Sequence, residues 1–360
     1  MSGIDSVKVN SNRIGFIDQC KGIGIILMVY GHCTTEGYLH NNSFSMLFKS
    51  WFTSFHMPLF FIIGGILLAY KNETFIFPKT LVKKAKQLLL PGLYFSCLSI
   101  MMFVLIKLIS NENVLQYLKD SALGVLTLQF SDAMWFLPCY FFAEILFLLS
   151  IKRPAFSWWP FVVCLICFVI AIVTSFYSGF LIRISRTMMA ICLIGFGYML
   201  YQFALYKRHN NGDQKKTDSS RTRILLFGGG IILLVVGAVG SYFNGSVDCV
   251  SANYGKSPLL FLPDALAGSI GLILVFIAID KRIPPLEFFG KNSLIVLCTH
   301  MFIVNIFWII NGKVLHIDLV DVSAPLLALG VLLVEIPIIL IINQFFPFLI
   351  GRKQSQGRFM

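Results

Sequence analysis

Apolar stretches of about 20 residues recur along the whole chain, and this repetition limits the possible folds more than any other feature. A helix needs about 20 mostly apolar residues to cross the hydrocarbon core of a bilayer. Hydropathy predicts ten spans: Ile14–Cys33, Met46–Tyr70, Leu88–Ile109, Ala133–Ile151, Trp158–Tyr177, Met188–Tyr206, Ile224–Phe243, Pro258–Asp280, Asn292–Ile310 and Ala324–Phe346. We therefore expect an all-α, polytopic membrane protein embedded in the lipid bilayer.

Composition agrees with this expectation, because 57% of the residues are hydrophobic and only 13% are charged. Soluble domains carry about 25% charged residues. The spans leave no room for a separate soluble domain, so we expect one membrane domain over residues 1–360. The only long polar stretch, residues 207–223, is expected to be a flexible cytoplasmic loop. The short apolar run Ser121–Phe130 is either re-entrant or interfacial.

The basic residues predict how the spans are oriented. With the N-terminus in the cytoplasm, most of the 29 Lys and Arg residues fall in cytoplasmic loops or tails. The exceptions are Lys49, Lys107, Lys119, Arg183, Arg186, Lys256 and Lys313. We therefore expect an even number of spans and both termini in the cytoplasm. Because the basic residues lie in short loops between spans, the net charge of +12 does not indicate nucleic-acid binding.

The first span contains three ionisable residues, Asp18, Lys21 and His32, and such residues are functional candidates within a membrane. Eleven steps of about 100° place Lys21 and His32 on one helix face, roughly 16 Å apart along the axis. Asp18 lies one turn from Lys21, within reach for an ion pair. His32 either takes part in chemistry or forms a hydrogen bond to a neighbouring helix.

The second span contains His56 two residues before Pro58. A proline removes one helical hydrogen bond, and at membrane depth the freed carbonyl needs another donor. His56 is placed to supply that donor, although a role in substrate binding is equally open. Cys164 and Cys167 have C-x-x-C spacing without a second pair or a nearby His, so we expect no metal or redox site.

The run from Arg13 to His32 resembles the opening of acyltransferase family 3, in particular the branch described as fucose 4-O-acetyltransferase-like. That family has an Arg or Lys followed, after ten residues, by a His in its first span, which Lys21 and His32 match. The segment Phe55–Leu67 resembles the second block of the family, with Gly64 where the family usually has Ser.

Further segments resemble later blocks of the family. Lys83 and Lys86 keep the spacing of the family's R-x-x-R pair before the third span, with Lys in place of Arg. The segments Trp135–Pro138 and Ser293–His300 resemble weaker blocks, and the second of these ends on a histidine that either packs or acts. The resemblance covers most of the chain, including its ten spans.

The resemblance implies an O-acetyltransferase of the plasma (inner) membrane, of the kind found in bacteria. It implies transfer of an acyl group, usually acetyl, from cytoplasmic acetyl-CoA to a hydroxyl of a surface polysaccharide or a lipid-linked glycan, without a metal. We expect His32 to be the general base, with Lys21 and Asp18 beside it. The residues expected to contact donor or acceptor are Arg13, Lys83, Lys86, His56, Trp135 and Glu144.

Two other functions remain open at the level of the sequence. A transporter or flippase for a glycan or lipid intermediate would have the same spans and would not consume acetyl-CoA. A glycan polymerase is a third possibility, although the outer loops at 34–45 and 244–257 are short for one.

Overall fold

The computed structural model describes residues 15–34, 43–71, 76–109, 113–130, 132–151, 158–205, 220–311 and 323–352. The described part is helical and contains no strand, which confirms the all-α polytopic prediction. The helices that correspond to the predicted spans are α1 (Gly15–Cys33), α3 (Ser43–Lys71), α4 (Phe77–Ile109), α6 (Phe136–Ile151), α7 (Trp159–Ser175), α8 (Phe180–Leu200), α11 (Ser220–Asn244), α12 (Pro258–Ile279), α14 (Ser293–Ile310) and α15 (Ser323–Phe345).

Within the described ranges, eight of these helices are long and apolar enough to cross a membrane on length and composition alone. The other two, α1 and α7, depart for different reasons. Helix α7 has only 17 residues. Helix α1 carries Asp18, Gln19, Lys21 and His32, which lower its hydropathy. Yet α1 is surrounded by other helices, and Asp18 and Gln19 are buried, so protein covers polar groups that lipid would not tolerate.

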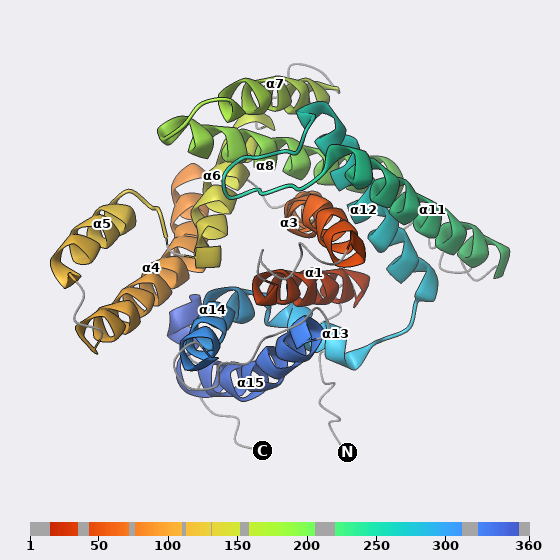
Figure 1. The fold of residues 1–360 in the computed structure, drawn as a ribbon. Helices are drawn as coiled ribbons and strands as arrows, with labels where there is room; N and C mark the ends of the chain where they lie inside the picture. The colour runs from red at the N-terminus through yellow and green to blue at the C-terminus, as the bar shows by residue number, and fades with distance from the viewer. Residues whose placement is uncertain are drawn as a thin grey trace, which may run out of the picture.

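Helices α1 and α3 lie at the centre of the bundle (Figure 1). Helix α1 packs against α3, α12, α14 and α15, and α3 packs against α8 and α12. The pairs α7 with α8 and α11 with α12 form the sides next to α3, while α14 and α15 cover the opposite side of α1 (Figure 1). Helices α1 and α3 correspond to the first two predicted spans, and their residues are therefore placed to form an enclosed site.

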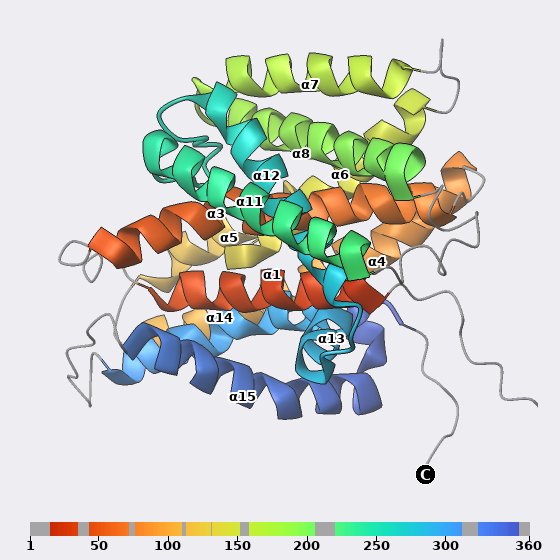
Figure 2. The ribbon, with the colours of Figure 1, turned by 90° about the vertical axis from the view of Figure 1, so that its right-hand side faces the viewer.

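The long helices run side by side, so the bundle has two ends (Figure 2). We call the end with Lys84, Lys281, Arg282 and Lys291 the basic end, and the other end, where α1 finishes, the His32 end. The charge distribution predicts that the basic end faces the cytoplasm. Helix α1 connects the two ends through the middle of the molecule.

Three segments outside the predicted spans are helical. Helix α5 (Val114–Leu126) overlaps the short run Ser121–Phe130 and packs beside α4, and none of its residues is buried. A re-entrant segment inside the bundle would be buried, so the interfacial alternative fits. Helix α13 (Pro284–Lys291) lies under α1 at the basic end, with prolines in its first turn. Helix α11 begins at Ser220, so the last residues of the predicted 207–223 loop are helical, while residues 206–219 lie outside the described part.

Reporter fusions test the predicted orientation. Fusions at Asn210 and Lys353 should report the cytoplasm, and fusions at Asn41 and Asn253 should report the outside, because basic loops stay on the cytoplasmic side. An outside signal at Asn210 would show that the number of spans before it is odd.

Candidate active site

Two histidines from helices far apart in the sequence meet near the His32 end. His32 lies in the last turn of α1 and is exposed, and His300 of α14 is fully buried. Their ring centroids are 5.1 Å apart, with the planes inclined at 47°. The Nδ1 atom of His300 is 2.7 Å from the carbonyl oxygen of Val296. An accessible imidazole therefore lies against a second imidazole held by its own helix.

His56 of α3 is the third histidine of this region, and it lies close enough to His32 for their charges to interact. Its Nδ1 is 3.0 Å from the carbonyl oxygen of Phe52. Helix α3 continues through Pro58 without a break. The carbonyl that Pro58 leaves without its helical donor belongs to Ser54. The hydrogen bond of His56 therefore goes to another carbonyl, and the predicted compensation is wrong.

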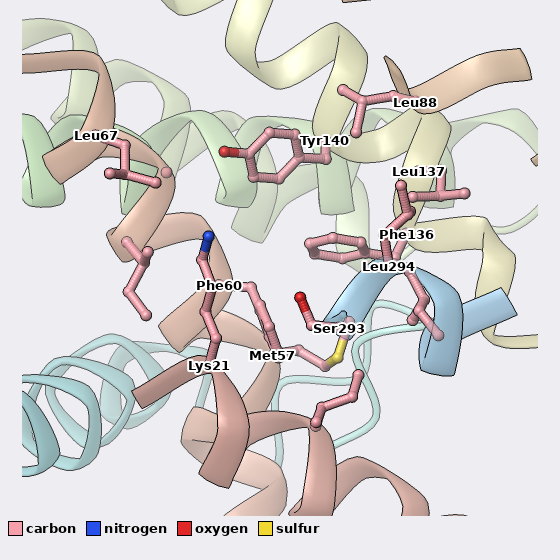
Figure 3. A pocket seen from close by; sticks show the side chains of 14 residues that line it. Lys21, Met57, Phe60, Leu67, Leu88, Phe136, Leu137, Tyr140, Ser293 and Leu294 are labelled. Atoms are coloured by element: carbon pink, nitrogen blue, oxygen red, sulfur yellow. The ribbon is translucent and has the colours of Figure 1, made fainter. Parts of the chain in front are cut away.

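A pocket of about 170 Å³ lies between this group and the basic end. Lys21 and Ile25 of α1, Met57 of α3, Tyr140 of α6 and Leu297 of α14 contribute to its lining, which is mostly apolar. In Figure 3 the ammonium of Lys21 and the hydroxyl of Tyr140 point toward the same part of the pocket. Met57 follows His56 directly and Leu297 lies three residues before His300, so the pocket reaches to within about one turn of the histidines.

Gly64 of α3 lies under the hydroxyl of Tyr140. A Cβ atom at position 64 would overlap with the Tyr140 side chain. The ring of Tyr140 also stacks on Phe61, with centroids 5.8 Å apart. The hydroxyl of Tyr140 thus occupies the space above the glycine that replaces the usual serine of the second block. Tyr140 and Ser293 are thus residues that bring hydroxyl groups to the pocket lining.

The lysines of α4 separate into two groups. Lys83 and Lys86 are exposed at the basic end. Lys84 is only 20% exposed and forms an ion pair of 2.5 Å with Glu144, which is 2% exposed. Glu144 lies one turn after Tyr140, and Leu88 of the pocket lies one turn after Lys84. Glu144, expected from the sequence to contact substrate, is therefore the ion-pair partner of a lysine that the sequence did not single out.

Helix α13 fixes the beginning of α1. A Cβ atom on Gly22 would overlap with the carbonyl of Leu286, and one on Gly290 would overlap with the carbonyl of Asp18, so the two backbones touch. Asp18 is buried at this contact. In α13, Glu287 accepts a hydrogen bond of 2.8 Å from Lys291, which holds the pKa of its carboxyl below the usual value. The contact fixes the part of α1 that carries Lys21, one of the residues lining the pocket.

The remaining predicted site residues lie elsewhere. Trp135 belongs to a short 3₁₀ helix, Asp132–Trp135, which packs against α14, and it precedes Phe136 of the pocket. The guanidinium of Arg186 lies 5.3 Å from the centre of the Trp135 ring and also donates to the carbonyl of Val250. Arg13 lies outside the described residues.

The sequence predicted that Lys21 and His32 lie on one face of α1. In the structure Lys21 lines the pocket, and His32 is exposed in the last turn of the helix. Sequence reasoning did not predict that His300, which ends the family-like segment Ser293–His300, lies against His32. It missed Lys84 and Tyr140, whose only sequence signal is their one-turn spacing from Leu88 and Glu144.

The model of a protein family described as an acyltransferase domain, acyltransferase family 3, matches residues 14–349. No curated protein and no solved structure matches the chain. The matched range includes every residue of the pocket and all three histidines.

Proposed function

The chain belongs to acyltransferase family 3 and is a membrane acyltransferase, and we propose that it transfers acetyl from cytoplasmic acetyl-CoA to a hydroxyl of a surface polysaccharide or a lipid-linked glycan. The observation that carries the proposal is the pocket, which begins at Lys21 and ends about one turn from His56 and His300. A thioester on a long flexible arm needs such a passage, because its charged nucleotide stays at the basic end.

The lining of the pocket suits the donor. Coenzyme A carries phosphates at one end and an uncharged pantetheine arm at the other. The exposed Lys83 and Lys86 are point-charge ligands for the phosphates at the basic end. The apolar walls, including Phe60 and Leu88, suit the arm, and the ammonium of Lys21 and the hydroxyl of Tyr140 offer donors to its amide carbonyls.

His32 acts as the base in this proposal. A hydroxyl of the acceptor gives its proton to His32 while its oxygen attacks the thioester carbon. A C–O bond forms and the C–S bond breaks, and the proton passes from His32 to the departing thiolate, giving free coenzyme A and the acetyl ester. A histidine is suited to this exchange because its ordinary pKa lies near neutrality. The exposure of His32 gives an acceptor access to it.

The most direct experiment compares surface glycans of the host with and without this protein by mass spectrometry. Acetyl esters that depend on the protein support the proposal. Purified protein in vesicles should also release free coenzyme A from acetyl-CoA only when an acceptor is present. Movement of a glycan across the vesicle membrane without release of coenzyme A would favour a transporter instead.

The role of the exposed lysines in donor binding gives a separate prediction. Lys83→Ala with Lys86→Ala should raise the KM for acetyl-CoA about tenfold and leave kcat and protein level unchanged, because lost phosphate contacts weaken binding alone. Replacing both with Arg should preserve the wild-type KM, since Arg also binds phosphates. The matched control is Lys79→Ala, an exposed lysine one turn earlier on α4. A normal KM in the double Ala variant would leave these lysines with a role in topology only.

A further inference from the structure

The imidazole of His300 has a defined proton arrangement. Its Nδ1 lies 2.7 Å from the carbonyl oxygen of Val296, and a carbonyl can only accept a hydrogen bond, so Nδ1 carries the proton. In neutral imidazole the other nitrogen, Nε2, is then an acceptor. This Nε2 is buried and has no hydrogen-bond partner within the described part of the chain. A buried acceptor without a partner is costly, and such groups in native proteins are few.

The ring of His32 is a nearby group that could donate a hydrogen bond to Nε2 of His300. Two imidazoles joined by one N–H···N bond, with about 3 Å between the bonded nitrogens, have ring centres roughly 5 Å apart. The ring centroids of His32 and His300 are 5.1 Å apart. His32 is exposed, whereas His300 is fully buried and anchored through Nδ1.

We propose that His300 is a positioning residue whose Nε2 accepts a hydrogen bond from the ring of His32 and so orients His32 for proton transfer. The inference rests on the proposed function, because it needs His32 to be the base. When His32 takes the proton of the acceptor, both of its ring nitrogens become donors. One faces the oxygen that lost the proton, and the other then has an acceptor in His300. A carboxylate has this orienting role in the Ser-His-Asp triad.

The surroundings of His300 keep it in place. The preceding residue, Thr299, lies within 2.8 Å of both carboxyl oxygens of Glu335 on α15, and its hydroxyl also approaches the carbonyl of Ile295. This contact ties the turn of α14 that carries His300 to the neighbouring helix. The charged groups that act on the ring of His32 are Lys49 and Asp248, in addition to the neighbouring imidazoles. The surroundings therefore hold His300 in place beside the exposed His32.

The test compares His300→Gln with His300→Phe. Gln retains a side-chain oxygen that can accept from His32, and Phe has a ring of similar size without an acceptor. We expect His300→Phe to lower kcat by about 10²-fold, since a misplaced catalytic group costs about that much, with the KM for acetyl-CoA within twofold. His300→Gln should recover at least tenfold of that loss. In a His32→Ala background, His300→Phe should cause no further loss, because the two residues act as a unit.

Each outcome decides the question. Equal losses in His300→Phe and His300→Gln, with normal acetyl-CoA binding, would mean that His300 only packs and would overturn the inference. So would a wild-type kcat in His300→Phe. Should the Phe variant fail to bind acetyl-CoA, His300→Met supplies a flexible apolar replacement with the same expected loss. A fully active His32→Ala protein would instead refute the proposed base itself, and its partner with it, which separates the two failures.

Discussion

Replacing His32 with Ala or Gln should lower the rate of acyl transfer by about 10²–10⁴-fold, the usual cost of losing a general base. The loss should fall on kcat, because His32 is not among the residues that line the pocket proposed to receive the donor. A covalent acyl-histidine intermediate would cost more than this range. The measurement is release of free coenzyme A and acetylation of the acceptor, normalised to protein level, together with binding of acetyl-CoA.

The control is His56→Ala. His56 is half-buried, bonded to Phe52 and packed with its ring 5.6 Å from that of Phe52, so its loss should reduce protein level and leave partial activity. The two variants thus separate a chemical effect from a packing effect in neighbouring imidazoles. A His32→Ala protein that acetylates at nearly the wild-type rate would remove His32 from the mechanism and leave the base to another residue.

The spans were predictable because hydropathy is a local property of the chain. All ten predicted spans correspond to helices, including α1, whose polar residues would exclude it on hydropathy alone. Helix boundaries were less predictable: α4 begins at Phe77, well before the predicted Leu88, because its first turns are polar and lie at the basic end. Helix α13 was missed because eight residues are too short for a periodic signal, although Pro284 and Pro285 mark its start.

The candidate site was predictable only along single helices. Lys21 and His32 share a face because helical geometry fixes their spacing. The meeting of His32 with His300, 268 positions later, depends on α14 packing against α1, and no local pattern encodes that contact. The choice of Lys84 over its neighbours is similar. Three lysines lie within four residues, and only the position of Glu144 on α6 decides which one is drawn inward.

Placing a single methyl group at Gly65 or Gly197 should unfold or misassemble the protein. A Cβ atom on Gly65 of α3 would overlap with the backbone of Ile194, and one on Gly197 of α8 would overlap with the backbone of Ile62. The two helices touch through their backbones, as small residues permit in membranes. A backbone cannot move aside as a side chain can, so Gly65→Ala must push the helices apart. Overpacking costs about 1–3 kcal/mol and occasionally more, and we expect these variants at or above the upper end.

The chain supplies matched controls for this prediction. Gly330 of α15 and Gly228 of α11 have no atom within 4 Å of a Cβ position, so the same substitution meets open space there. Ala favours a helix over Gly by about 1 kcal/mol, so Gly330→Ala and Gly228→Ala should leave thermal stability in detergent unchanged or slightly raised. The sign of the effect therefore separates contact from helix propensity. Helix α3 also carries His56 and five residues of the pocket wall, Met57, Phe60, Ile63, Gly64 and Leu67. A Gly65→Ala protein that did fold should therefore bind acetyl-CoA more weakly. Wild-type stability and binding in Gly65→Ala would show that α3 and α8 are farther apart than the structure places them.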